Sequence, residues 1–249
     1  MMDVGNSAIK WATLTQKGLE PQQSLLYQQE NVMPVLEKIA ITLQNQIEAI
    51  WISSVVSSET TRSLTQWAHE NWGILPVFAK TSGQVGNIRN GYKKPEQLGV
   101  DRWLALLAAR HLENGQLCIV DCGTAVTLDI LSAENEHIGG LIMPGVGLMQ
   151  QSFMTKTHAL KQLADEIPLP TNAPVILARD TASAIILGTL YAVVGWLEYV
   201  LSSLEKQKGH FILILTGGNA STLHPLLSKP CQYVPDLVLQ GLVTLANDS

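Results

Sequence analysis

The chain has 249 residues, of which 46% are hydrophobic and 15% are charged, and its formal net charge is -5. This length and composition allow a large buried core, either in one domain or in two. The acidic balance and the lack of clustered Lys and Arg argue against binding through a nucleic-acid phosphate backbone.

Three cysteines, Cys118, Cys122 and Cys231, form no CxxC pair and no zinc-like spacing with histidine. We therefore expect a reducing, cytoplasmic location, with Cys118 and Cys122 buried as small hydrophobic side chains. No charged start with an apolar signal core is present, so export is not expected. Polar residues interrupt the long apolar stretch 182–204, which favours a buried or interface helix over a membrane span.

Short apolar runs alternate with helical stretches in the first third of the chain, which favours an α/β or α+β fold. The pattern predicts helices and strands in the order strand 7–15, helix 32–46, strand 47–56, helix 60–73 closed by a glycine, and strand 74–80. Only Met1 and Met2 precede Asp3, so we expect the strand before it to be shortened or lost. Asp3 would then be weakly anchored, or the natural start would lie upstream.

The later part of the chain repeats this arrangement. A helix carrying Trp103 and Arg110 precedes an apolar run, an Asp-Cys-Gly-Thr turn at Asp121 and an alternating strand. The turns Asp3-Val-Gly-Asn and Asp121-Cys-Gly-Thr therefore share one local pattern and one context. This repetition predicts two duplicated domains, which we expect at residues 1–115 and 116–249.

The residue types in these turns suit a phosphate and metal site. Glycine lets the backbone approach a ligand, exposed amides donate to phosphate oxygens, and a carboxylate can hold hydrated magnesium. Lys10 follows on the next strand and is long enough to reach a transferring phosphoryl group. For each turn the alternative is a hairpin stabilised by its Asp side chain, with no ligand.

Neither a P-loop nor a GxGxxG motif occurs, so the common routes to nucleotide binding are absent. A third glycine turn, Thr216-Gly217-Gly218-Asn219, follows another apolar run. It either places bare backbone against a nucleoside or simply connects a strand to a helix. The sequence pattern leaves both possibilities open.

Polar residues are concentrated in the segment GYKKPEQLGVDRW. Asp101 and Arg102 adjoin the predicted start of a helix, where the helix field keeps a carboxylate ionised and able to accept a proton or hydrogen bond. Arg102 offers a planar fork for a carboxylate or phosphate. The alternative is that Asp101 helps to cap the helix while Arg102 lies in solvent.

Six motifs, taken in order, resemble those of type III pantothenate kinases. They are DVGNS with Lys10, GYKKPEQLGVDRW, DCGTAVTLD, GGLIMPGVGLM, DTASAIILG and TGGNA. The resemblance spans nearly the whole chain, and Leu-Gly-x-Asp-Arg is its most specific element. It implies an α/β fold of two duplicated ribonuclease-H-like domains, as in the acetate and sugar kinase, Hsp70 and actin superfamily. Each domain would contain a mixed five-stranded sheet flanked by helices, with ATP between the halves.

The same resemblance implies roles for individual residues. ATP would be bound by Asp3, Val4, Gly5, Asn6, Ser7, Ala8, Ile9, Lys10, Thr124, Gly217 and Gly218. Asp3 would lie near magnesium through water, and Asp121 would help to seat a monovalent cation, potassium or ammonium. The substrate would be bound by Tyr92, Gly99, Val100, Asp101, Arg102 and Thr181, with Asp101 as the catalytic proton acceptor.

The implied function is ATP-dependent phosphorylation of pantothenate to 4'-phosphopantothenate, the first step of coenzyme A biosynthesis, by a cytoplasmic homodimer. One alternative is a kinase or phosphohydrolase of the same superfamily acting on another small acceptor. Another is a non-catalytic, nucleotide-binding regulatory homologue. The segment 139–145 is expected to be a rigid loop that lines the acceptor pocket or a dimer contact, or a structural turn. The helix after Thr181 is the second dimer candidate, because its apolar faces exceed what one sheet covers.

Overall fold

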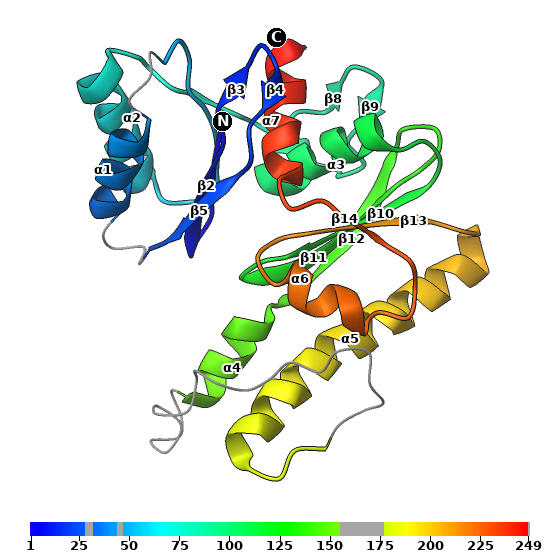
Figure 1. Ribbon diagram of the computed structural model, residues 1–249. Helices are drawn as coiled ribbons and strands as arrows, with labels where there is room; N and C mark the ends of the chain where they lie inside the picture. Colours follow the sequence, from blue (N-terminus) through cyan, green and yellow to red (C-terminus); the bar gives the residue numbers. More distant parts are fainter. Residues whose placement is uncertain (28–31, 44–46, 155–176, 249) are drawn as a thin grey trace. The chain divides into compact units, whose positions relative to one another are not determined.

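The computed structural model describes residues 1–27, 32–43, 47–154 and 177–248, which form two compact units (Figure 1). The first unit contains Met1–Asn114, Glu134–Gly139 and Asp236–Ser249, and the second contains Gly115–Ala133 and Gly140–Pro235. The chain passes from the first unit to the second after Asn114, and its last helix belongs to the first unit.

The first unit is built on a five-stranded sheet with the order β5-β2-β1-β6-β7. The strands are β1 (Met2–Val4), β2 (Ala8–Trp11), β5 (Gln23–Leu26), β6 (Trp51–Ser54) and β7 (Val77–Phe78). The pairs β1–β2 and β2–β5 are antiparallel, whereas β1–β6 and β6–β7 are parallel. The strand before Asp3 is shortened, as expected, but not lost: β1 has three residues against six in β10 of the second unit. Contrary to the expected weak anchoring of Asp3, β1 is paired on both sides.

Helices cover both faces of this sheet (Figure 1). On one face, α1 (Met33–Thr42) and α2 (Ser58–Trp72) enclose a core with the apolar side chains of β1, β2 and β6. On the other, α3 (Val100–Leu112) and α7 (Leu237–Asn247) pack against each other and against β6. A Cβ at Gly241 would lie 2.6 Å from the carbonyl carbon of Leu104, so the two helices meet at a glycine.

Local signals explain the helix ends in the first unit. The side chain of Ser57 accepts a hydrogen bond from the Thr60 amide at the start of α2, and Gly73 ends that helix with a φ of 68°. The predicted closure by Gly73 is therefore confirmed. Residues 44–46 of the predicted helix 32–46 lie outside the described residues. Two small hairpins and a 3-10 helix complete the unit: β3 (Leu14–Thr15), β4 (Gly18–Leu19), β8 (Gln84–Val85), β9 (Ile88–Arg89) and η1 (Pro95–Gln97).

The second unit repeats the sheet order, as β12-β11-β10-β13-β14. Its strands are β10 (Leu117–Cys122), β11 (Ala125–Leu131), β12 (His137–Pro144), β13 (Ile212–Thr216) and β14 (Gln232–Tyr233). As in the first unit, the central strand pairs antiparallel with the next strand and parallel with the fourth. The duplication predicted from the two Asp-x-Gly turns is confirmed. Residues 139–145 are not the expected loop, because most of them continue the edge strand β12.

Within its described residues, the second unit has the helices α4 (Val146–Met154), α5 (Thr181–Lys208), α6 (Ala220–Leu223) and the 3-10 helix η3 (His224–Leu226). α5 is long and apolar enough to cross a membrane by length and composition. One of its faces, however, packs in the core of the sheet through residues such as Val193 and Leu197. Cys118 and Cys122 are buried in the same core, and burial raises the pKa of both thiols. Their predicted role as buried hydrophobic side chains fits this environment.

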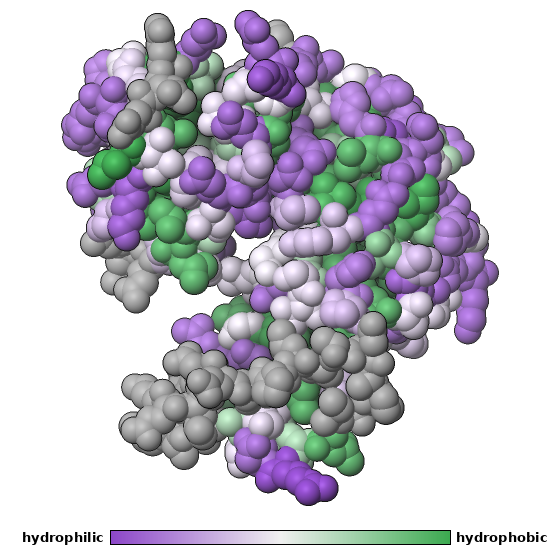
Figure 2. All heavy atoms as spheres, in the orientation of Figure 1, coloured by the Kyte–Doolittle hydropathy of each residue, from purple (hydrophilic) through white to green (hydrophobic). Residues whose placement is uncertain are grey.

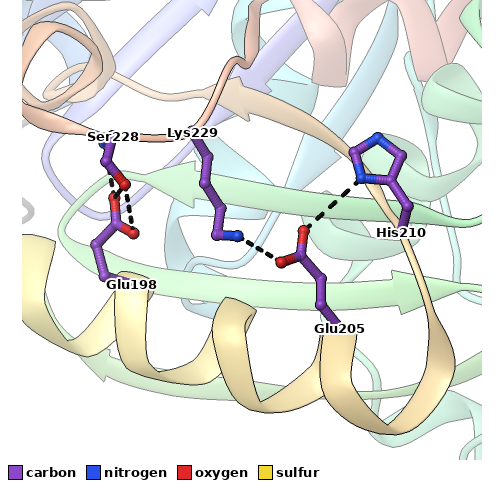
Figure 3. Close-up of polar contacts among 5 residues, drawn as sticks. All are labelled: Glu198, Glu205, His210, Ser228 and Lys229. Carbon is purple, nitrogen blue, oxygen red and sulfur yellow. Dashed lines mark hydrogen bonds and ion pairs between the residues drawn. The ribbon is translucent and has the colours of Figure 1, made fainter.

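Polar contacts tie the segment after η3 to α5 (Figure 3). The Glu198 carboxylate accepts hydrogen bonds from the Ser228 amide at 2.7 Å and from the Ser228 hydroxyl at 2.9 Å. Two turns further along α5, the Glu205 carboxylate forms an ion pair with Lys229. Its Oε1 lies 3.8 Å from Nδ1 of His210. The loop that leads from the third glycine turn to β14 is therefore held at two points.

Candidate active site

The first Asp-x-Gly turn is a tight hairpin between β1 and β2. The Gly5 amide donates to the Ala8 carbonyl at 3.1 Å, and Asn6 and Ser7 are exposed at its tip. Asp3 is paired in register with Lys10 on β2 and with Ser53 on β6. Asp3 thus lies between a lysine and a serine, next to an exposed turn. The lysine and the backbone amides can donate to phosphate oxygens, and the carboxylate can hold a hydrated cation.

Two residues next to this turn, Ser53 and Tyr27, were not predicted from the sequence. Ser53 is fully buried, and its hydroxyl has no hydrogen-bond partner among the residues that the structure describes. Tyr27 follows β5 and donates its hydroxyl to the Gly5 carbonyl at 2.6 Å. Ser53 was detectable as a polar residue at the end of a buried strand. Tyr27 had no such signal, because its position depends on the pairing of β5 with β2.

A second group of predicted residues meets at the start of α3. Arg102 is 7% exposed, and its Nη1 donates to the Tyr92 hydroxyl at 3.0 Å. The Tyr92 ring stacks on His137, with ring centroids 5.6 Å apart and an interplanar angle of 20°. Arg102 is therefore not in solvent, contrary to the alternative considered from the sequence. A buried guanidinium held by an aromatic hydroxyl is suited to bind a carboxylate in a fixed orientation.

Glycine is required where Tyr92 and His137 approach each other. A Cβ at Gly91 would overlap the His137 carbonyl oxygen and lie 2.9 Å from its carbonyl carbon. The side chain of Asn90 fixes the same turn, because it accepts from the Tyr92 amide at 3.0 Å and donates to two carbonyls. Neither His137 nor Asn90 was predicted as a site residue. Both support Tyr92.

Asp101 is the second residue of α3, and its carboxylate folds back over the helix start. Oδ1 of Asp101 accepts a hydrogen bond from the Arg102 amide at 2.8 Å. A Cβ at Gly99 would lie 2.6 Å from the same Oδ1. The Asp101 carboxylate therefore accepts from an amide in the first turn of α3, as it would if it helped to cap the helix. The absence of a side chain at Gly99 leaves the space that the carboxylate occupies.

We expect Gly99→Ala to slow any reaction that depends on the Asp101 carboxylate, with kcat about tenfold lower, while the melting temperature changes little. Gly99 has a φ of -52°, which alanine adopts without strain, so the added methyl group acts mainly by displacing the Asp101 carboxylate. Gly83→Ala is the matched control, since a Cβ there would make only an ordinary contact at 3.8 Å with Pro95. Steady-state kinetics and thermal unfolding of both variants test this. Equal kcat values for the two variants would contradict it.

The second Asp-x-Gly turn, at Asp121, is enclosed by glycines. The Gly145 amide donates to the Thr124 carbonyl at 2.9 Å, and a Cβ at Gly145 would lie 2.5 Å from that oxygen. A Cβ at Gly217 would overlap Oδ1 of Asp121. The end of the segment 139–145 and the third glycine turn thus both pack against this turn. The Asp121 carboxylate is therefore packed closely against the backbone of the third glycine turn.

The remaining predicted residues of the second unit lie near helix starts and turns. Thr181 is the first residue of α5, next to Asp180, whose carboxylate accepts from the Ser183 amide at 2.9 Å. The hydrogen bonds from the amide and the hydroxyl of Ser183 lower the pKa of the Asp180 carboxyl. Thr124 is exposed, and Gly218 is followed by α6. The third glycine turn connects β13 to α6, and the Asn219 amide in it donates to the Cys122 carbonyl at 2.9 Å.

A cavity of about 530 Å³ lies elsewhere in the first unit. It opens between the start of β1 and the end of β2, the end of the hairpin opposite to the Asp3 turn, and its lining includes Trp11, Thr13 and Ile47. None of the predicted site residues lines it. The chemistry-bearing residues therefore lie at the turns and not in this cavity.

Residues 1–203 match the protein family described as type III pantothenate kinase. A type III pantothenate kinase of Nitrosococcus oceani is 34% identical over 255 residues, covering 100% of this chain and 94% of that protein. One of Hydrogenovibrio crunogenus is 36% identical over 241 residues, covering 96% and 95%. The chain belongs to the type III pantothenate kinase family. The resemblance noted from six short motifs is thus confirmed over the whole length.

Solved structures agree with this family in fold. An ethanolamine utilization protein from Carboxydothermus hydrogenoformans superposes with a TM-score of 0.55 at 10% identity, covering 100% of this chain and 88% of that one. The activator of 2-hydroxyisocaproyl-CoA dehydratase from Clostridium difficile gives 0.52 at 8% identity, covering 99% and 94%. With the repeated sheet order, they show that this pantothenate kinase family member has the duplicated α/β fold of actin-like ATPases and sugar kinases.

Proposed function

We propose that the protein transfers the γ-phosphoryl group of ATP to pantothenate, giving 4'-phosphopantothenate in the first step of coenzyme A biosynthesis. The observation that carries this proposal is the match to type III pantothenate kinases over nearly the whole chain. It is supported by three side chains around the start of α3: the carboxylate of Asp101, the guanidinium of Arg102 and the hydroxyl of Tyr92.

In this proposal Asp101 accepts the proton of the attacking primary hydroxyl of pantothenate. A carboxylate with an ordinary pKa near 4 is a weak base at neutral pH. In a loose phosphoryl-transfer transition state, however, the main task of this residue is to orient the hydroxyl. Arg102, held by Tyr92, would bind the carboxylate of pantothenate. By the family motifs, Tyr92, the segment Gly99 to Arg102 and Thr181 would bind the substrate.

The phosphates of ATP are proposed to bind at the first turn. The backbone from Asp3 to Ile9 would supply amide donors, and Lys10 would stabilise negative charge on the transferring group. In the second unit, Thr124, Gly217 and Gly218 are proposed to contact the nucleotide. Each assignment rests on the family motifs and on the donor sets described above.

Magnesium and a monovalent cation are the proposed cofactors. Magnesium, when bound, would neutralise charge on the phosphate oxygens, with Asp3 holding it through water. In the described part of the chain, no group of three or more His, Cys, Asp or Glu residues forms a metal cage. This fits an ion held jointly by one carboxylate and substrate phosphates. Asp121, which packs closely against the backbone at Gly217, would help to seat potassium or ammonium.

The experiment that tests this function is an ADP-release assay with purified protein, ATP and magnesium. Release should require pantothenate and increase when potassium or ammonium replaces sodium. A panel of small sugars and hydroxy acids serves as the set of competing acceptors. ADP release with another acceptor but not with pantothenate would overturn the proposed substrate. Nucleotide binding without any acceptor-dependent turnover would instead indicate a regulatory homologue.

We also propose that the protein acts in the cytoplasm as a homodimer. Hydrophilic side chains cover much of the face shown in Figure 2, with smaller hydrophobic areas between them. Exposed apolar side chains gather on the edge strand β12 and the following helix α4, among them Leu141, Ile142 and Phe153. A second copy would remove such an edge and its apolar residues from water. Light scattering should give twice the chain mass of 27.1 kDa, and a monomer mass would contradict the dimer.

A further inference from the structure

Tyr27 makes two hydrogen bonds to the first turn from the side of β5. Its hydroxyl donates to the Gly5 carbonyl at 2.6 Å, and its backbone amide donates to the Ser7 carbonyl at 3.1 Å. The second bond continues the antiparallel ladder in which Ala8 is paired with Leu26. Two of the carbonyls in the turn are therefore fixed by one residue that lies 20 or more positions further along the chain.

The hydroxyl bond controls the orientation of a whole peptide plane. In a trans peptide group the carbonyl and the amide N–H point in opposite directions. Because the Gly5 carbonyl is held towards Tyr27, the Asn6 amide of the same plane is directed away from Tyr27. A turn that lacked this bond would let the plane rotate, since glycine at position 5 allows a wide range of conformations.

The surroundings keep the Tyr27 hydroxyl protonated. Burial raises the pKa of Tyr27, and the negative charge of Asp3 raises it further. A tyrosine whose pKa lies above its ordinary value near 10 stays a hydrogen-bond donor throughout the neutral and mildly alkaline range.

We propose that Tyr27 is a positioning residue of the phosphate turn, which fixes the Gly5–Asn6 peptide plane so that its amide is presented to the nucleotide phosphates. The inference rests on the proposed binding of ATP phosphates at this turn. Tyr27 does not touch the reacting atoms and acts through the turn. Its loss therefore weakens phosphate binding without changing the acceptor side of the reaction.

The test is Tyr27→Phe, which removes only the hydroxyl and keeps the ring packed. The loss of one such hydrogen bond corresponds to about a threefold to tenfold increase in KM for ATP. KM for pantothenate and kcat should stay close to the wild-type values. Tyr233→Phe is the control, because it removes the same hydroxyl from a half-exposed tyrosine on β14 of the second unit. Calorimetric titration with ADP and with inorganic tripolyphosphate measures the same effect without turnover.

The outcomes separate this inference from the proposed function. Weaker binding of both ADP and tripolyphosphate by Tyr27→Phe supports the inference, even if the wild-type protein fails to phosphorylate pantothenate. Unchanged affinity for both ligands overturns it. It is also overturned if both KM values rise together with a fall in melting temperature, since that pattern indicates a general loss of structure. A wild-type protein that binds neither ligand would overturn the inference and the proposed function together.

Discussion

Replacing Asp101 with asparagine should lower kcat for pantothenate phosphorylation by about two orders of magnitude, because a neutral amide cannot accept the hydroxyl proton. ATP affinity should change little, because Asp101 is assigned to the acceptor. The fold should persist, since the amide oxygen of asparagine can still accept from the Arg102 amide that now bonds Oδ1 at 2.8 Å. The loss of a negative charge at the start of α3 should cost about 0.3–1 kcal/mol of stability.

Glu96→Gln is the matched control for this change. Glu96 is an exposed acid in η1, in the same segment, and its replacement removes the same charge. Initial rates at saturating ATP, with thermal unfolding of both variants, give the comparison. If Asp101→Asn retains wild-type turnover while Glu96→Gln does too, Asp101 has no role as proton acceptor.

Local patterns in the sequence were sufficient to predict much of the fold. Gly73 ends α2. Each Asp-x-Gly turn joins the first two strands of its unit, and the two sheets have the same strand order. These features depend on residues close together in the chain, where glycine and apolar alternation act directly. The strand β1 was expected to be shortened or lost because the residues before Asp3 are few. It forms because β2 and β6 supply hydrogen bonds on both sides, which a local pattern cannot reveal.

The candidate site was predictable where a motif is contiguous and was missed where the contact is distant. Asp101 and Arg102 lie in one motif, and the structure places both at the start of α3. The sequence left open whether Arg102 binds the substrate or lies in solvent. Its burial could not be predicted, because it depends on the turn around Tyr92. Tyr27 and His137 act on motif residues from other strands. The pairing of β5 with β2 brings Tyr27 to the turn, and an isolated bridge between Arg89 and Glu136 brings His137 near Tyr92.

Gly217→Ala should destabilise the protein more than any other single change considered above. Gly217 has a φ of 95°, a conformation that costs alanine about 1–2 kcal/mol. The added Cβ would also overlap Asp121 and lie 2.6 Å from backbone atoms of Cys122. That backbone belongs to β10, which is paired with strands on both sides and cannot easily move away. Strain and overpacking together should cost about 3 kcal/mol or more.

The adjacent glycine provides the control for this prediction. A Cβ at Gly218 would meet no atom within 4 Å, so Gly218→Ala should leave the free energy of unfolding within about 0.5 kcal/mol of wild type. Chemical denaturation of both variants measures the difference. Because the overlap at Gly217 involves the Asp121 carboxylate itself, Gly217→Ala should also weaken activation by potassium or ammonium. A Gly217→Ala protein as stable as Gly218→Ala would show that the third turn does not pack on β10 as described.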